Sequence, residues 1–248
     1  MKFTILNFDS LDSTNTEALN QARRGASEGL CVVAREQTAG RGRHGRVWAS
    51  EKDAGLYLSL VLRPTLENKF LPLVTLMTAV AVYDVLCKFD GLQPDIKWAN
   101  DLHVGEKKIG GVLAEMTETK TGSAIVVGIG INLKSSNFPD DLKDSATSVE
   151  AETGQSPNIE SLLKNLTGEF AKFYRVLQSG GGAAAIRREW ARRSSYFEGK
   201  DVLVKLANES FSGTTRGIEE NGALRVETAA GEVRIVPAGD VERLRKTV

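Results

Sequence analysis

The chain of 248 residues has few of the residues that mark several common classes of protein. It contains two cysteines, Cys31 and Cys87, and two histidines, His44 and His103, and these form neither a CxxC pair nor a zinc-site spacing. Both cysteines lie in apolar stretches, so we expect reduced thiols in a cytoplasmic protein. Acidic and basic residues number 32 each, which argues against a basic nucleic-acid-binding coat and against an acidic tail.

Long hydrophobic segments are also absent. The N-terminus does not have the basic region followed by an apolar region that marks a signal peptide. The longest apolar run, residues 71–86, is interrupted by Thr75, Thr78 and Asp84 and falls short of the ~20 apolar residues of a membrane span. It predicts a buried core helix, and we expect no association with a membrane. The chain is long enough to bury a core without disulfide bonds.

Hydrophobic periodicity predicts an α+β region followed by a β-rich end. Apolar runs predict strands at residues 2–8, 30–34, 55–62, 95–98, 102–104, 108–117 and 123–132. Helices are predicted to begin near residue 12, behind a capping side chain, and to span 70–89, 159–177 and 183–196. From residue 200 onward, short runs and the Asn221-Gly222 turn signal predict a small barrel. The predicted domains are therefore 1–196 and 197–248.

Glycine is in surplus, with 24 residues against a usual share of about 7%. Three glycines lie in residues 40–46 (GRGRHGR), which formally match the GxGxxG dinucleotide fingerprint. We reject that interpretation, because residues 47–50 lead toward a strand instead of a helix and arginine fills the x positions.

The same stretch carries an uncompensated charge of +3, since no acidic residue lies between Gln37 and Ser50. Arg41, Arg43 and Arg46 can form forked hydrogen bonds with phosphate or carboxylate, and the nearby Trp48 can stack on a planar base. On spacing alone, a ligand-binding loop, a solvated loop and an RNA-binding tract all stay open.

Three further segments place polar residues at the ends of predicted strands. They are residues 97–101 (KWAND), 107–112 (KKIGGV) and 128–132 (GIGIN). Together they indicate a ligand site at one sheet. The chain has no GxxxxGK[ST], GxSxG or HExxH motif, and two histidines leave little room for histidine-based acid–base chemistry.

Five segments in order resemble the biotin protein ligase family: residues 13–15 (STN), 36–48 (EQTAGRGRHGRVW), 97–101, 108–113 (KIGGVL) and 128–132. Residues 211–224 resemble the small C-terminal barrel of that family. The resemblance implies an α+β fold: a mixed, mostly antiparallel sheet with helices on one face, like class II synthetases, plus a C-terminal SH3-like β-barrel. It also implies a ligase that uses ATP and Mg²⁺ to convert biotin to biotinyl-5′-AMP. Biotin then passes to a lysine of the biotin carboxyl carrier domain of acetyl-CoA carboxylase or a related carboxylase.

The resemblance further implies roles for individual residues. Biotin would be bound by Ser13, Thr14, Asn15, Gln37, Gly40, Arg41, Gly42, Arg43, Lys108 and Gly111. The nucleotide would be bound by Arg43, Arg46, Trp48, Lys97, Asn100 and Asn132. Lys108, Arg43 and Arg41 would be catalytic, and Asp101 would be the carboxylate for Mg²⁺. We expect residues 37–50 to be mobile without ligand and to become ordered over it.

The sequence departs from the family pattern in two places. Ala99 stands where the family commonly has proline, which puts little in doubt. Some members carry an N-terminal helix-turn-helix domain, but here the first motif begins at Ser13, so we expect a ligase without DNA binding. A homodimer is compatible with the resemblance. The alternatives are a lipoate or octanoate ligase or transferase of related fold, and a nucleic-acid-binding module without activity; the motifs at 13–15 and 40–46 favour biotin.

Overall fold

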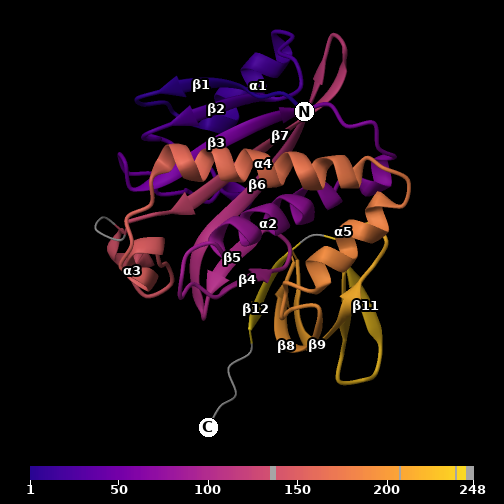
Figure 1. Cartoon of the computed structure of the whole chain (residues 1–248). Coiled ribbons are helices and arrows are strands. Elements are labelled where there is room, and N and C mark those ends of the chain that lie inside the picture. The colour runs from indigo at the N-terminus through magenta and orange to yellow at the C-terminus, as the bar shows by residue number, and fades with distance from the viewer. Residues whose placement is uncertain (135–137, 207, 238, 244–248) are drawn as a thin grey trace.

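The computed structural model describes residues 1–134, 138–206, 208–237 and 239–243. Its main sheet has seven strands in the order β1-β2-β3-β7-β6-β5-β4 (Figure 1). The strands are β1 (Thr4–Phe8), β2 (Leu30–Ala34), β3 (Gly55–Leu62), β4 (Pro94–Lys97), β5 (Asp101–Val104), β6 (Lys107–Thr119) and β7 (Gly122–Asn132). Only the β1–β2 pair is parallel among these strands. The expected mixed, mostly antiparallel sheet is therefore confirmed.

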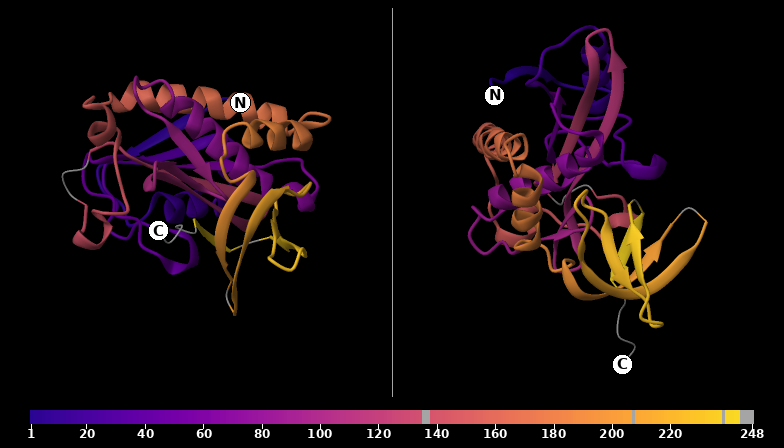
Figure 2. Two further views of the ribbon diagram at one scale, coloured as in Figure 1. Left: turned by 90° about the horizontal axis from the view of Figure 1, so that it is seen from below. Right: turned by 90° about the vertical axis from the view of Figure 1, so that its right-hand side faces the viewer.

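Helices lie on both faces of this sheet. The helices are α1 (Thr14–Arg23), α2 (Leu73–Leu86), α3 (Val149–Thr153), α4 (Ile159–Leu177) and α5 (Gly182–Ala191). Helix α2 packs on the sheet, and α4 and α5 cover α2 from outside (Figures 1 and 2). The expected covering of one face holds for these three helices. In contrast, α1 buries Ala18, Leu19 and Ala22 on the opposite face, against strand residues such as Val61 and Val126.

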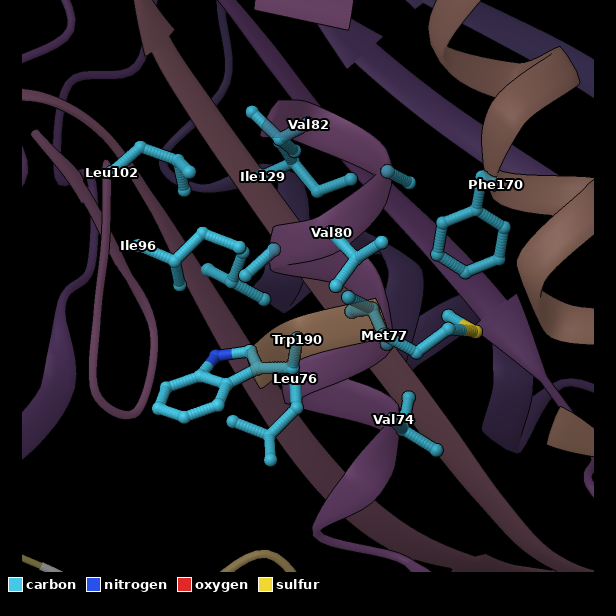
Figure 3. Packing of buried hydrophobic residues seen from close by; sticks show 14 of the residues in the cluster. Val74, Leu76, Met77, Val80, Val82, Ile96, Leu102, Ile129, Phe170 and Trp190 are labelled. Atoms are coloured by element: carbon cyan, nitrogen blue, oxygen red, sulfur yellow. The ribbon is translucent and has the colours of Figure 1, made fainter. Parts of the chain in front are cut away.

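The main core forms around α2, which is apolar on nearly all sides and is buried between the sheet and the outer helices. Figure 3 shows Met77 and Val80 of this helix among Ile129 of β7, Phe170 of α4 and Trp190 of α5. The segment Asn68–Leu86 is long and apolar enough to cross a membrane by length and composition. In this fold most of it is buried, as the predicted core helix.

Strand β3 shows why the two faces differ. Leu56, Leu58, Leu60 and Leu62 point into the core around α2, whereas Tyr57, Ser59 and Val61 point to the α1 face. All eight residues of the strand are buried, so both faces of the sheet are covered here. The alternation predicted from sequence is confirmed, and it separates a core face from a face that carries polar groups.

The C-terminal sheet has five antiparallel strands in the order β11-β10-β9-β8-β12. They are β8 (Glu198–Lys205), β9 (Ser210–Ile218), β10 (Leu224–Glu227), β11 (Val233–Val236) and β12 (Asp240–Arg243). The predicted turn at Asn221-Gly222 joins β9 to β10, and the Gly222 carbonyl accepts a hydrogen bond from Trp98 Nε1 at 2.9 Å. The main core continues into this sheet. The second sheet begins at Glu198, which supports the division near residue 197 that we propose.

Helix α5 ends earlier than its apolar pattern predicts. It stops at Ala191, five residues before the predicted end. Ser194 Oγ donates to the Ile96 carbonyl at 2.5 Å, and Ser195 bonds both through its backbone and its hydroxyl to Asp95. These serines bind the chain to β4 instead of continuing the helix.

Candidate active site

A pocket of about 390 Å³ lies on the α1 face of the main sheet, between the start of α1, the loop 37–50 and strands β5 to β7. Fifteen of the sixteen residues predicted for the site line it. They are Ser13, Thr14, Asn15, Gln37, Arg41, Gly42, Arg43, Arg46, Trp48, Lys97, Asn100, Asp101, Lys108, Gly111 and Asn132. The remaining one, Gly40, packs behind the lining, beside the backbone of Trp48. The fold thus brings together segments that are far apart in the sequence.

Residues 37–50, here called the arginine loop, form a short hairpin. The Trp48 N–H donates to the Gly40 carbonyl at 2.9 Å, and the Gly42 N–H donates to the Arg46 carbonyl at 2.7 Å. A Cβ on Gly40 would lie 2.2 Å from the Trp48 carbonyl oxygen, so only glycine fits there. The tip turns through His44 and Gly45, both with positive φ. Mobility of this loop without ligand stays a prediction.

The base of the arginine loop is tied to the start of α1. Gln37 Oε1 accepts a hydrogen bond from the Thr14 N–H at 2.8 Å, and Gln37 Nε2 donates to Ser50 Oγ at 2.7 Å. Ser13 occupies the N-cap position, but its side chain makes no capping bond, so the expected capping by a side chain is not found at this position. It is 2% exposed and lines the pocket instead.

Glycines on β6 and β7 make room for the side chains of the site. Gly111 and Gly130 are cross-strand partners beneath the indole of Trp48. A Cβ on Gly130 would lie 2.5 Å from Trp48 Cε2, and one on Gly128 would lie 2.2 Å from Asn15 Oδ1. Real Cβ contacts are essentially never this short. The glycine surplus therefore has a function at these strand positions: it lets Trp48 and Asn15 lie directly on the sheet.

The three arginines of the loop bond partners that are distant in the sequence, and two of these partners are carboxylates. Arg41 forms an ion pair with Glu115 of β6, and Arg46 forms one with Asp240 of β12. Arg43 instead donates to the neutral amide oxygen of Asn100 at 2.8 Å. No ion pair in the described part of the chain includes Arg43. The expected local charge of +3 is therefore reduced by two carboxylates, and neither Glu115 nor Asp240 was predicted for the site.

Strands β4, β5 and β6 contribute Lys97, His103 and Lys108 to the lining of the pocket. Lys108 Nζ lies 2.7 Å from Asp101 Oδ1 and 5.2 Å from the centre of the Trp48 ring. Burial lowers the pKa of Lys97, and the nearby charge of Lys108 lowers it further. Burial and the charge of Lys97 lower the pKa of His103 to about 4, so this imidazole is neutral near pH 7. His103 was not predicted as a site residue. The available signal was its position two residues after Asp101, which places both side chains on the same face of β5.

The stretch 135–196 carries no motif, yet part of it completes the pocket. Leu142, Ser145 and Ala146 line one side. The Ser145 carbonyl accepts from the Lys108 N–H at 2.8 Å, so this segment pairs with the start of β6. Asn132 Nδ2 donates to the Thr147 carbonyl at 3.0 Å, which holds the predicted adenine-binding side chain against the same segment.

The described residues contain no group of three His, Cys, Asp or Glu side chains that could hold a metal ion by themselves. Mg²⁺ is commonly bound by one or two carboxylates together with the phosphates of a nucleotide. Asp101 is the carboxylate predicted for that lesser role, and it lines the pocket. A metal there would compete with Lys108, whose Nζ is 2.7 Å from Asp101 Oδ1, and the charge on the phosphates would have to offset the repulsion from the lysine.

The sequence profile of the Biotin/lipoate A/B protein ligase family matches residues 7–132, and that of the Biotin protein ligase C terminal domain matches residues 198–244. The biotin--[acetyl-CoA-carboxylase] ligase of Paracoccus denitrificans is 35% identical over 93% of this chain and 96% of its own. The chain belongs to the biotin protein ligase family. The resemblance inferred from five short motifs is thereby confirmed.

Other biotin protein ligases agree over nearly the whole chain. The bifunctional ligase/repressor BirA of Bacillus subtilis is 37% identical over 94% of this chain and 72% of its own. The structure of the Aquifex aeolicus biotin protein ligase in complex with biotin and ATP superposes with a TM-score of 0.85 and 27% identity, covering 98% and 100% of the two chains. The C-terminal domain match favours biotin over the lipoate and octanoate alternative, since that profile describes the C-terminal domain of biotin protein ligases.

Proposed function

We propose that this chain is an ATP-dependent biotin--[biotin carboxyl-carrier protein] ligase. The observation that carries the proposal is the convergence of Arg43, Lys108 and Trp48 on the same pocket as the buried polar residues of α1. The Paracoccus relative is named as a ligase of this type, and the Aquifex relative binds biotin and ATP. We assign three parts of the pocket to three parts of the ligands: a small polar ring, the two anionic groups that react, and a planar base.

The α1 end of the pocket would bind the ring system of biotin. Ser13, Thr14 and Asn15 are 2–4% exposed and line this end of the pocket with hydroxyl and amide groups. Gln37 fixes the start of this group through its bond to Thr14. The Asn15 amide is already bonded to Leu113, Glu115 and Ser59 and is therefore held in one orientation. The selectivity we propose is for a ring whose donors meet the oxygen atoms that this group presents.

The middle of the pocket would join two anions. A biotin carboxylate oxygen attacks the α-phosphorus of ATP, a new O–P bond forms, and the bond to pyrophosphate breaks with its electron pair on the leaving group. Lys108 and Arg43, which both line the pocket, would hold the carboxylate and the α-phosphate and would stabilise the charge that develops between them. No nucleophile from the protein is needed. Arg41, which is paired with Glu115 in this structure, would help to bind the biotin carboxylate.

The far end of the pocket would bind the nucleotide. Trp48 presents an indole face on the platform of Gly111 and Gly130, suited to stacking against a base or sugar. Arg46, Lys97 and Asn100 would meet the phosphates, and Asn132 would meet the adenine. Mg²⁺ bound to the phosphates would neutralise their charge, with Asp101 as a protein ligand.

In the second half-reaction, a lysine amine of the acceptor attacks the acyl carbon of biotinyl-5′-AMP, an amide bond forms, and AMP leaves. The acceptor we propose is the biotin carboxyl carrier domain of acetyl-CoA carboxylase or a related carboxylase, as the name of the Paracoccus relative suggests. We also propose a cytoplasmic location. Homodimer formation and the absence of DNA binding stay predictions.

ATP–pyrophosphate exchange tests the proposal directly. Exchange should require biotin, and lipoate or octanoate at the same concentration should not replace it. Transfer to a purified carrier domain should then be followed by mass spectrometry of the modified lysine. Exchange that is independent of biotin, or that is equally fast with octanoate, would refute the assignment.

A further inference from the structure

Glu115 lies at the centre of β6 and contacts two different parts of the proposed biotin site. Its Oε2 accepts a hydrogen bond from Asn15 Nδ2 at 2.8 Å, and its Oε1 accepts one from Arg41. Asn15 belongs to α1 and Arg41 belongs to the arginine loop. The side chain of Glu115 is 23% exposed, so both contacts are partly shielded from water.

The contact with Glu115 decides the orientation of the Asn15 amide. Asn15 Nδ2 donates to Glu115 and to the Leu113 carbonyl at 3.2 Å, both of which only accept hydrogen bonds here. Asn15 Oδ1 therefore points the other way, where Ser59 Oγ donates to it at 2.6 Å. The amide has one arrangement that satisfies all of these partners.

Only a carboxylate can hold both donors at once. Asn15 and Arg41 each present an N–H to a separate oxygen of Glu115, and an ionised carboxylate accepts at both oxygens. An amide in its place has one accepting oxygen, and its NH₂ group would face a second donor. Hydrogen bonds that involve charged groups are also stronger than neutral ones.

We infer that Glu115 is a positioning residue for biotin: it orients Asn15 and holds Arg41, and so links the ring-binding end of the pocket to the arginine loop. The inference rests on the proposed function. It assigns Glu115 no contact with the reacting atoms. Its loss should therefore weaken the use of biotin without altering the chemistry at Lys108 or the binding of ATP.

The test is biotin-dependent ATP–pyrophosphate exchange with Glu115→Gln. We expect the KM for biotin to rise about tenfold, while kcat and the KM for ATP stay within about twofold of wild type. Glu115→Asp keeps the charge but is one methylene shorter, so it should give a smaller rise. Glu118→Gln is the matched control, because this exposed carboxylate on the same strand bonds Ser123 and no site residue. It should match wild type.

Three results would overturn the inference. The first is an unchanged KM for biotin in both Glu115 variants. The second is a lowered KM for biotin, which would mean that Glu115 competes with the ligand for Arg41. The third is an equal change in kcat and both KM values, which would indicate a general structural role. If Glu115→Gln does not fold, by circular dichroism, Glu115→Asp and titration calorimetry with biotin alone provide the same comparison. A wild-type protein without exchange activity would refute the proposed function instead.

Discussion

Substitution of Gly130 by alanine should move Trp48 and damage nucleotide binding while the fold persists. The new Cβ would lie 2.5 Å from Cε2 and 2.6 Å from Nε1 of the indole, whereas ordinary contact begins at 3.4 Å. Gly130 sits on the central strand β7, so the loop residue gives way and not the sheet. The ring must retreat by about 1 Å, and a displacement of that size can cost on the order of 10²-fold in rate when it misplaces a substrate.

The assay is steady-state exchange at saturating biotin with varied ATP. We expect the KM for ATP to rise at least tenfold in Gly130→Ala, with the free energy of unfolding reduced by about 1–2 kcal/mol because of local overpacking. Gly111→Ala should raise the KM for ATP less, since its Cβ would lie 3.3 Å from the same ring. That Cβ would also lie 3.1 Å from Lys108 Cε, so this variant tests Trp48 and Lys108 together.

Gly168→Ala is the control for the substitution itself. Gly168 lies exposed in α4 with no atom within 4 Å of the added Cβ. Alanine there should raise stability by up to about 1 kcal/mol through helix propensity and leave both KM values unchanged. A wild-type KM for ATP in Gly130→Ala would refute the placement of Trp48 beside the nucleotide.

Three other predictions concern titratable side chains. Lys108→Ala should reduce kcat of exchange at least 100-fold while thermal unfolding stays cooperative, because one fixed cation at the junction is lost; activity near wild type would contradict its role. Below pH 6.5 only the unfolded chain readily protonates His103, whose folded pKa is about 4, so urea titrations should show stability falling by up to about 3 kcal/mol toward pH 4, and less in His103→Gln. Burial raises the pKa of Cys31 to about 12, so peptide mapping should find it unmodified by iodoacetamide in the native protein at pH 8.

Local sequence patterns predicted most strands of the main sheet and the two longest helices of the chain. The run 159–177 matches α4 residue for residue, and the leucine alternation of 55–62 gives β3. The predicted end of α5 was wrong because Ser194 bonds a distant backbone carbonyl. Periodicity along one segment carries no information about its neighbours in space. The covering of one face, which the resemblance implied, does not extend to α1, because this helix packs on the other face.

The site was predictable to the extent that its residues lie in short motifs. Glu115 and Asp240 could not be found in that way, because they meet Arg41 and Arg46 only after 74 and 194 residues of intervening chain have folded. Ser145 and Ala146 were missed because this segment pairs with the start of β6 through backbone atoms, and backbone contacts leave no pattern of side chains in the sequence. Charge counted along the sequence therefore overstated the free charge of the arginine loop.

The alternation of strands β3, β6 and β7 explains why the pocket lies on the α1 face. Along β7, Ile129 and Ile131 fill the core around α2. Gly128 and Gly130, which alternate with them, leave space on the other face for Asn15 and Trp48. A shift of β7 by one residue would exchange the two sets, since successive side chains point to opposite faces. Isoleucine would then lie where a single methyl group already clashes, and glycine would leave voids in the core. The same register thus fills the core and keeps the pocket open, so both the stability of the fold and the binding of ligand require this register of β7.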